Sequence, residues 1–161
     1  FMGGEIGQSE EWNHERSLDW HLLQYPEHAG VHRLVRALNS VYRAHPALWE
    51  RDFDWTGFRW LDPNDTEHSV LSFLRHNAAH NQPLVCVANL TPVVRHGYQI
   101  GLPQGGQWTE VLNTDAPDFA GSGLRNESIE ADPVPWQDQD HSARLTLPPL
   151  AVLWLTPHNT G

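Results

Sequence analysis

One change of pattern divides this chain and limits what it can fold into. Between Pro26 and Pro46 the apolar residues recur at helical spacing, and after Pro46 this period does not return. Short β-prone runs take its place, separated by turn-rich segments. We therefore expect a mainly β chain that contains one amphipathic helix and a C-terminal antiparallel β-sandwich.

The helix prediction rests on an apolar stripe and two prolines. The stripe has spacings of three and four residues, which place its side chains on one helix face. Its members are Val31, Leu34, Val35, Leu38, Val41 and Tyr42. Pro26 suits a helix entrance and Pro46 suits a position beyond its exit, so we expect a helix from about residue 27 to about residue 44.

Seven β-prone runs follow the helix, a number typical of a two-sheet sandwich. They are 57–61, 69–75, 84–90, 98–102, 108–112, 143–147 and 151–156. Pro148 and Pro149 separate the last two runs, which prevents a tight two-residue hairpin and predicts a wider turn or a crossing between sheets. Residues 115–140 are rich in Gly, Pro, Ser and acids, so we expect a surface excursion there with at most one short edge strand.

The first 25 residues lack a sustained period. Residues 1–5 resemble the end of a strand that stops in a glycine turn, with nothing before them to pair with. Residues 7–25 are polar and aromatic, which predicts a long loop with one helical turn. Ordered loops of that length are usually functional.

Charge and composition exclude several classes of partner. The formal net charge of -10 disfavours nucleic acid and anionic membranes, because binding to them needs clustered cations. No apolar stretch approaches the roughly 20 residues of a membrane helix, and no signal peptide opens the chain. We therefore expect a cytoplasmic protein that contacts neither nucleic acid nor membrane. The single Cys86 lies in an apolar run, which predicts a buried, inert thiol.

The 11 histidines and 8 tryptophans raise two further questions. His28 and His32 are four residues apart on the expected helix, but no third ligand has a recognisable spacing, so we expect no metal and no cofactor. The tryptophan excess is compatible with carbohydrate binding, since an apolar sugar face stacks on an indole. Core packing is the default for Trp20, Trp108 and Trp154, which have apolar neighbours.

Several segments, taken together, resemble bacterial 1,4-α-glucan (glycogen) branching enzymes of the α-amylase type. The N-terminal ones are Phe1-Met2-Gly3-Gly4-Glu5-Ile6-Gly7-Gln8, Glu11-Trp12-Asn13-His14 and Ser17-Leu18-Asp19-Trp20-His21-Leu22-Leu23. The later ones are Leu38-Asn39-Ser40-Val41-Tyr42-Arg43, Gly57-Phe58-Arg59-Trp60, Asn89-Leu90-Thr91-Pro92, Leu112-Asn113-Thr114-Asp115 and Leu147-Pro148-Pro149-Leu150. They occur in the family's order and cover nearly the whole chain.

The resemblance implies a division of the chain and a reaction. Residues 1–46 would be the end of a (β/α)₈ barrel, comprising the end of strand 8, a loop and helix 8, and residues 47–161 would be the β-sandwich domain. The parent enzyme would cleave an α-1,4 glucan and transfer the chain to a 6-hydroxyl, using two carboxylates roughly 5 Å apart. In this family those carboxylates precede the segment matched by Phe1, so no residue here inherits a catalytic role. The implied partners are α-glucan and the missing N-terminal barrel.

Five residues are candidates for contact with the glucan. Glu5 and Gln8 would lie at the C-terminal end of a barrel strand, where such active sites are built; a hydrogen bond that holds the loop is the alternative. Trp12 and His14 belong to the loop that follows, and Trp60 would lie near the domain junction. Loop packing for Trp12 and a core position for Trp60 are their alternatives.

Three other functions remain open at this point. A maltooligosyl trehalose trehalohydrolase could share the first five residues, although the blocks 12–14 and 17–23 favour a branching enzyme. A free-standing carbohydrate-binding module would need several exposed aromatic residues on one sandwich face. A purely structural domain would make no glucan contact.

Overall fold

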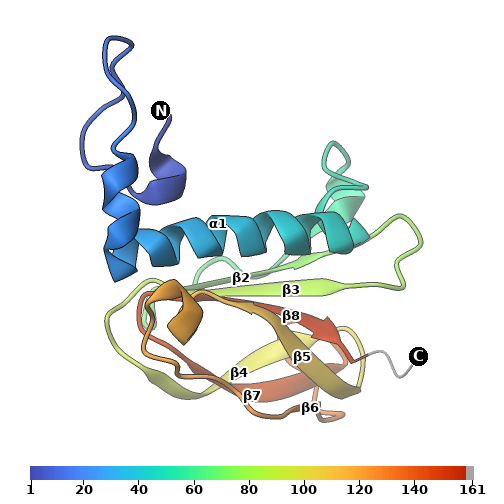
Figure 1. Ribbon diagram of the computed structural model, residues 1–161. Helices are drawn as coiled ribbons and strands as arrows, with labels where there is room; N and C mark the ends of the chain where they lie inside the picture. The colour runs from blue at the N-terminus through green and yellow to red at the C-terminus, as the bar shows by residue number, and fades with distance from the viewer. Residues whose placement is uncertain (159–161) are drawn as a thin grey trace.

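One long helix lies along a β-sandwich. The computed structural model describes residues 1–158. Helix α1 (Pro26–Ala44) runs across the top of the β structure in Figure 1, and the N-terminal segment projects from its first turn. That segment contains two 3-10 helices, η1 (Gly4–Ile6) and η2 (Trp20–Gln24). The predicted helix is confirmed, with its start one residue earlier than expected and Pro26 in its first turn.

The strands form two antiparallel sheets. The larger sheet has the order β1-β2-β3-β8-β5-β6, and the smaller sheet pairs β4 with β7. The bounds are β1 (Phe58–Asp62), β2 (Val70–Arg75), β3 (Leu84–Asn89), β4 (Arg95–Leu102), β5 (Gly106–Asn113), β6 (Ile129–Ala131), β7 (His141–Leu147) and β8 (Val152–Pro157). The mainly β fold is thereby confirmed, as is the single short edge strand within residues 115–140.

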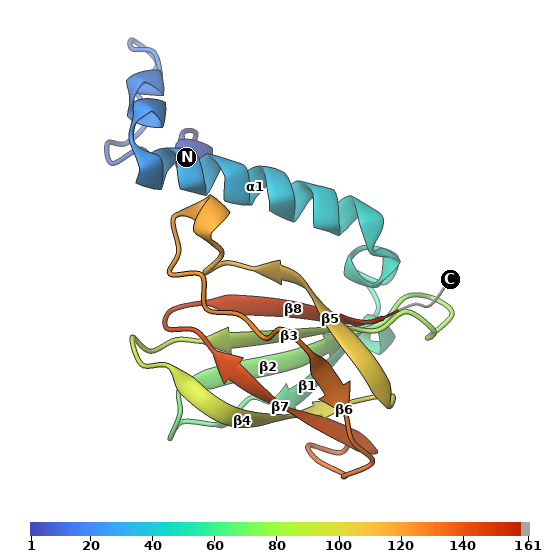
Figure 2. The same cartoon turned by 60° about the horizontal axis from the view of Figure 1, so that its bottom comes forward.

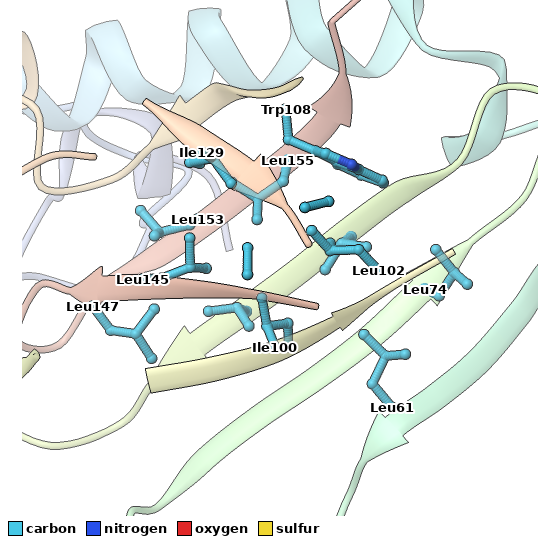
Figure 3. Packing of buried hydrophobic residues seen from close by; sticks show 14 of the residues in the cluster. Leu61, Leu74, Ile100, Leu102, Trp108, Ile129, Leu145, Leu147, Leu153 and Leu155 are labelled. Carbon is cyan, nitrogen blue, oxygen red and sulfur yellow. The ribbon is translucent and has the colours of Figure 1, made fainter. Parts of the chain in front are cut away.

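The core lies between the two sheets. Figure 3 shows Ile100 and Leu145 of the smaller sheet facing Leu153 and Leu155 of β8, and all four are at most 1% exposed. Trp108 is also buried and donates its indole N–H to the carbonyl of Gln104 at 3.1 Å, which confirms its core position. Alternation along β7 and β8 accounts for this arrangement, because side chains two apart point to the same face.

Cys86 lies in β3, between its neighbours β2 and β8. Its thiol is buried, and burial raises the pKa of Cys86 to about 12. The prediction of a buried thiol is therefore confirmed, and a thiolate is disfavoured at neutral pH.

Helix α1 is fixed to the sandwich at both ends. Near its start it packs on the short helix η5 (Pro117–Phe119), where Arg33 donates a hydrogen bond to the Asp118 carbonyl. Near its end Val41 joins a second apolar cluster around Ala47, Leu48 and Leu84. The segment after β5, which contains η5, thus provides the surface on which the start of α1 packs.

Gly30 permits this close approach. A Cβ at Gly30 would lie 2.6 Å from the Phe119 carbonyl oxygen, which belongs to backbone and cannot swing aside. Gly30→Ala gains about 1 kcal/mol of helix propensity, but the added methyl group clashes with the backbone of η5. We therefore expect a net destabilisation of about 1 to 2 kcal/mol. Urea unfolding of the variant measures the change in the free energy of unfolding. Ser40→Ala, at an exposed position of the same helix, is the control and should stabilise the protein by a few tenths of a kcal/mol. A stabilised Gly30→Ala protein would contradict the close packing of α1 on η5.

Two local predictions were wrong. Residues 1–5 form no strand: Gly4–Ile6 is a 3-10 helix, because residues 1–158 offer no neighbouring strand for this segment to pair with. Trp20 is not a core residue, since it is 52% exposed in η2. No helix within residues 1–158 is long and apolar enough to span a membrane.

Candidate functional site

Gln8 holds the N-terminal loop closed. Its side-chain oxygen accepts a hydrogen bond from the Asp19 N–H at 2.9 Å, and its amide group donates to the Glu10 carbonyl at 2.9 Å. Both polar ends of the amide are therefore engaged within the loop. This is the loop-holding alternative given above for Gln8, and contact with substrate remains a prediction.

Trp12 and His14 belong to the same loop, and Figure 1 shows the segment between η1 and η2 standing away from the sandwich. Trp12 is 38% exposed and meets Phe1 edge to face, with ring centroids 5.7 Å apart. The His14 ring lies beside it at 6.3 Å. The Asn13 side-chain oxygen accepts a hydrogen bond from the Glu15 N–H at 2.9 Å, which stabilises the turn that contains His14. The arrangement offers a partly open indole surface.

Glu5 lies beside the polar side of α1. It borders a shallow groove of about 540 Å³ whose other walls are helix residues, including Arg36, Asn39 and Arg43. The neighbouring His28 has its Nδ1 2.8 Å from the Ile6 carbonyl oxygen, so it ties η1 to the helix. Within residues 1–158 no group of three or more His, Cys, Asp or Glu side chains is arranged to hold a metal ion.

Trp60 lies on β1, the edge strand of the larger sheet, and is 48% exposed. The core alternative is therefore wrong for this residue. Its ring packs edge to face on Phe58 at 4.9 Å and on Phe73 at 6.0 Å. The preceding segment adds Phe53 and Trp55, which are 107% and 86% exposed.

The five predicted residues do not form one site. The Trp12 loop precedes α1 and the Trp60 segment follows it, and the 19 residues of this helix span about 28 Å. Glu5, Gln8, Trp12 and His14 share the N-terminal segment, whereas Trp60 belongs to a separate aromatic surface. The structure thus presents two surfaces at opposite ends of one helix.

A polar cluster that the sequence did not indicate lies at the β1–β2 loop. Tyr98 donates its hydroxyl to Asp65 at 2.9 Å, and the His68 Nδ1 lies 2.8 Å from the same carboxylate. Burial raises the pKa of the Tyr98 hydroxyl, and the bond to Asp65 adds to this effect. Burial opposes ionisation of Asp65 as well, but the hydrogen bonds from His68 and Tyr98 outweigh it and lower the pKa of Asp65. The carboxylate is thus kept charged and fixed at the rim of a cavity.

Comparison with known proteins relates the chain to a family. Residues 60–158, more than half of the chain, match the model described as "Alpha amylase, C-terminal all-beta domain". The chain is 53% identical over 156 residues to the 1,4-alpha-glucan branching enzyme GlgB of Aquifex aeolicus, and covers 25% of that protein. It is 53% identical over 158 residues to that of Cereibacter sphaeroides and 49% over 159 residues to that of Marinobacter nauticus, covering 22% and 25% of them.

These alignments include 96% to 98% of the present chain. The chain therefore spans about a quarter of the length of the curated relatives that it matches. Among solved structures, an α-amylase from H. orenii aligns with a TM-score of 0.47 and 16% identity, over 80% of this chain and 20% of that one.

Proposed function

This chain belongs to the family of the α-amylase C-terminal all-β domain, and we propose that it is the non-catalytic C-terminal part of a 1,4-α-glucan branching enzyme. The observation that carries the proposal is the identity of about 50% to curated branching enzymes along almost the whole chain. In this proposal residues 1–46 complete a catalytic barrel, and residues 47–161 form the appended sandwich. The enzyme is a cytoplasmic transferase that makes α-1,6 branches in glycogen.

The chemistry divides between this chain and the barrel. Retaining cleavage of an α-1,4 bond needs a nucleophilic carboxylate and an acid/base carboxylate roughly 5 Å apart. Among the acids of the N-terminal loop, Glu10 forms a 2.8 Å ion pair with Arg16, and both side chains are more than half exposed, as in an ordinary surface contact. In the proposal the barrel supplies both carboxylates and needs no metal or cofactor. The present chain supplies the loop surface of Trp12 and His14, together with Glu5 and Gln8, at the edge of the glucan groove.

Helix α1 is the element best suited to join the two parts. One side packs on η5 and the Ala47, Leu48 and Leu84 cluster, which fixes the helix to the sandwich. The side bordered by Glu5, Val35 and Asn39 carries the open groove, and in the proposal it faces the barrel. Trp60 and Trp55 extend that contact beyond the end of the helix.

A chimeric enzyme tests the proposal. The last quarter of the Aquifex aeolicus branching enzyme is replaced by this chain, and branching of amylose is followed by the fall in iodine absorbance. We expect activity from the chimera, none from this chain alone, and at most about 1% of the chimera's rate from the Aquifex protein lacking its last quarter, because an incompletely packed barrel misplaces its carboxylates. Circular dichroism confirms that each protein is folded. Branching by this chain alone, or a folded but inactive chimera, would overturn the proposal.

A further inference from the structure

A cavity lies beside the Asp65, His68 and Tyr98 cluster described above. It has a volume of about 510 Å³ and is lined by the β1–β2 loop, the first half of β4 and the turn before β7. Figures 1 and 2 both show β4 on the side of the sandwich remote from α1. Its size is within the range of about 300 to 1,000 Å³ that is usual for small-ligand sites.

An exposed indole at the edge of this cavity is held by a tight turn. Trp136 is 47% exposed, and its backbone exchanges two hydrogen bonds with Gln139 at 3.0 and 2.9 Å. The two residues between them, Gln137 and Asp138, have φ values of 50° and 56°, a conformation that usually selects Gly or Asn. Such backbone strain persists only where the surroundings enforce it, and it is common at ligand sites.

The strand beneath the turn enforces this conformation. Gln137 accepts a hydrogen bond from the Gly101 N–H at 2.9 Å, so its side chain anchors the turn to β4. A Cβ at Gly101 would lie 2.3 Å from the Trp136 carbonyl oxygen, so only glycine lets the turn lie so close. Trp136 is therefore presented on a rigid support, which lowers the entropic cost of binding a ligand against it.

The opposite wall of the cavity is polar and pre-arranged. Asp65 is fixed by Tyr98 and His68, as described above, and its side chain is only 12% exposed. Arg95 donates to the His68 carbonyl at 3.1 Å, yet its Nε–H is buried and has no hydrogen-bond partner among the described residues. The Arg95 side chain thus adds a fixed cationic donor to the cavity lining.

We propose that this cavity, with Trp136 as its platform, is a second binding site for an α-1,4-glucan chain. An indole beside fixed carboxylate, imidazole and guanidinium groups suits a neutral polyhydroxylated ligand, because sugar rings stack on the indole and sugar hydroxyls both donate and accept. Asp62 and Asp65 in the lining disfavour anionic ligands. The choice of an α-glucan among neutral saccharides rests on the proposed function. The site would hold a polymer on the sandwich while the barrel acts on another part of it.

Binding of maltoheptaose to the 161-residue chain, followed by isothermal titration calorimetry and by two-dimensional NMR, tests this site. Trp136→Ala should weaken the affinity by at least about tenfold, since truncating an aromatic anchor removes most of a small site's binding energy. Trp136→Phe should retain part of the affinity because it keeps an aromatic face. Trp49→Ala is the matched control: Trp49 is 42% exposed, close to the 47% of Trp136, and does not line the cavity, so the affinity should be unchanged.

The outcomes separate this site from the proposed function. Chemical-shift changes should centre on Tyr98, Gln99 and Trp136, and cellohexaose, which has β-1,4 bonds, should bind more weakly. Equal affinity of the wild type and Trp136→Ala, equal losses for Trp136→Ala and Trp49→Ala, or no binding at millimolar sugar would overturn the site. An active wild-type chimera in those cases leaves the proposed function intact. Maltoheptaose binding at Trp136 beside an inactive chimera would instead keep the site and reject the branching assignment.

Discussion

Replacing Asn89 with aspartate should lower the free energy of unfolding by about 4 kcal/mol at pH 7, because it leaves a buried carboxylate against two carbonyl oxygens. Asn89 is 1% exposed at the end of β3. Its amide donates to the carbonyls of Val93 and Pro148, each at 2.8 Å, and its oxygen accepts from the Thr91 N–H and hydroxyl. This side chain thus ties the β3–β4 turn to the crossing between β7 and β8.

The loss should depend on pH in a defined direction. Burial and the two carbonyl oxygens raise the pKa of the introduced carboxyl in the folded state above its unfolded value of about 3.9. The full penalty is therefore present above the folded pKa. It diminishes as pH falls from the folded pKa toward about 3.9, because the protonated carboxyl can donate one hydrogen bond. Urea unfolding of wild type and variant at several pH values gives this difference directly.

Two further variants serve as controls for Asn89. Asn39→Asp makes the same change at an exposed helix position and should alter the free energy of unfolding by less than about 0.5 kcal/mol. Asn89→Ala, which leaves four groups without a partner but adds no charge, should cost about 3 kcal/mol with no comparable pH dependence. A pH-independent loss in Asn89→Asp would show that the carboxyl does not face the two carbonyls.

Replacing Leu155 with alanine should have the second largest effect and lower the free energy of unfolding by about 3 kcal/mol. The loss combines the removed apolar contacts with the cavity that is left behind. Leu155 is fully buried on β8, the strand between β3 and β5 in the larger sheet. It faces Leu145 of the smaller sheet across the core, as Figure 3 shows, so neither sheet can close over the gap without shifting. Urea or thermal unfolding of Leu155→Ala measures the loss.

Leu90→Ala removes the same atoms from a side chain that is 56% exposed. Its effect should stay within about 0.5 kcal/mol. Similar losses for the two variants would mean that the sandwich core is not assembled around β8.

The periodic segments were predictable from the sequence because the spacing of their apolar residues indicates which side chains are buried. The stripe of α1 and the runs of β2, β3 and β8 were placed to within one residue at each end. The partition into six and two strands was not predictable, since pairing such as that of β8 with β3 depends on residues far apart in the chain. The strand end predicted for residues 1–5 was wrong for a related reason: a strand forms only beside a partner strand, and the described residues provide none for this segment.

The candidate site shows the same limit. Trp12 and His14 could be placed on a projecting loop because the segment is polar and lacks a period. The exposure of Trp60 could not be inferred, because the residue pattern of 57–61 is compatible with a central strand as well as with an edge strand. Trp136 carried one usable signal, an indole within a Pro-rich and acidic excursion where no core strand is expected. Its support from Gly101 joins residues 35 positions apart and has no local signature.

The place of β8 has a consequence for how the protein is made. Because β8 lies between β3 and β5, a nascent chain that has not yet reached Val152 holds two strands with nothing between them. Such a chain exposes the open edges of β3 and β5 and lacks Leu153 and Leu155 of the core, and exposed strand edges and apolar surface promote chaperone binding and aggregation. The larger sheet therefore cannot be completed during translation until β8 has been synthesised. A chain that ends ahead of this strand would be degraded and would not form a smaller folded domain.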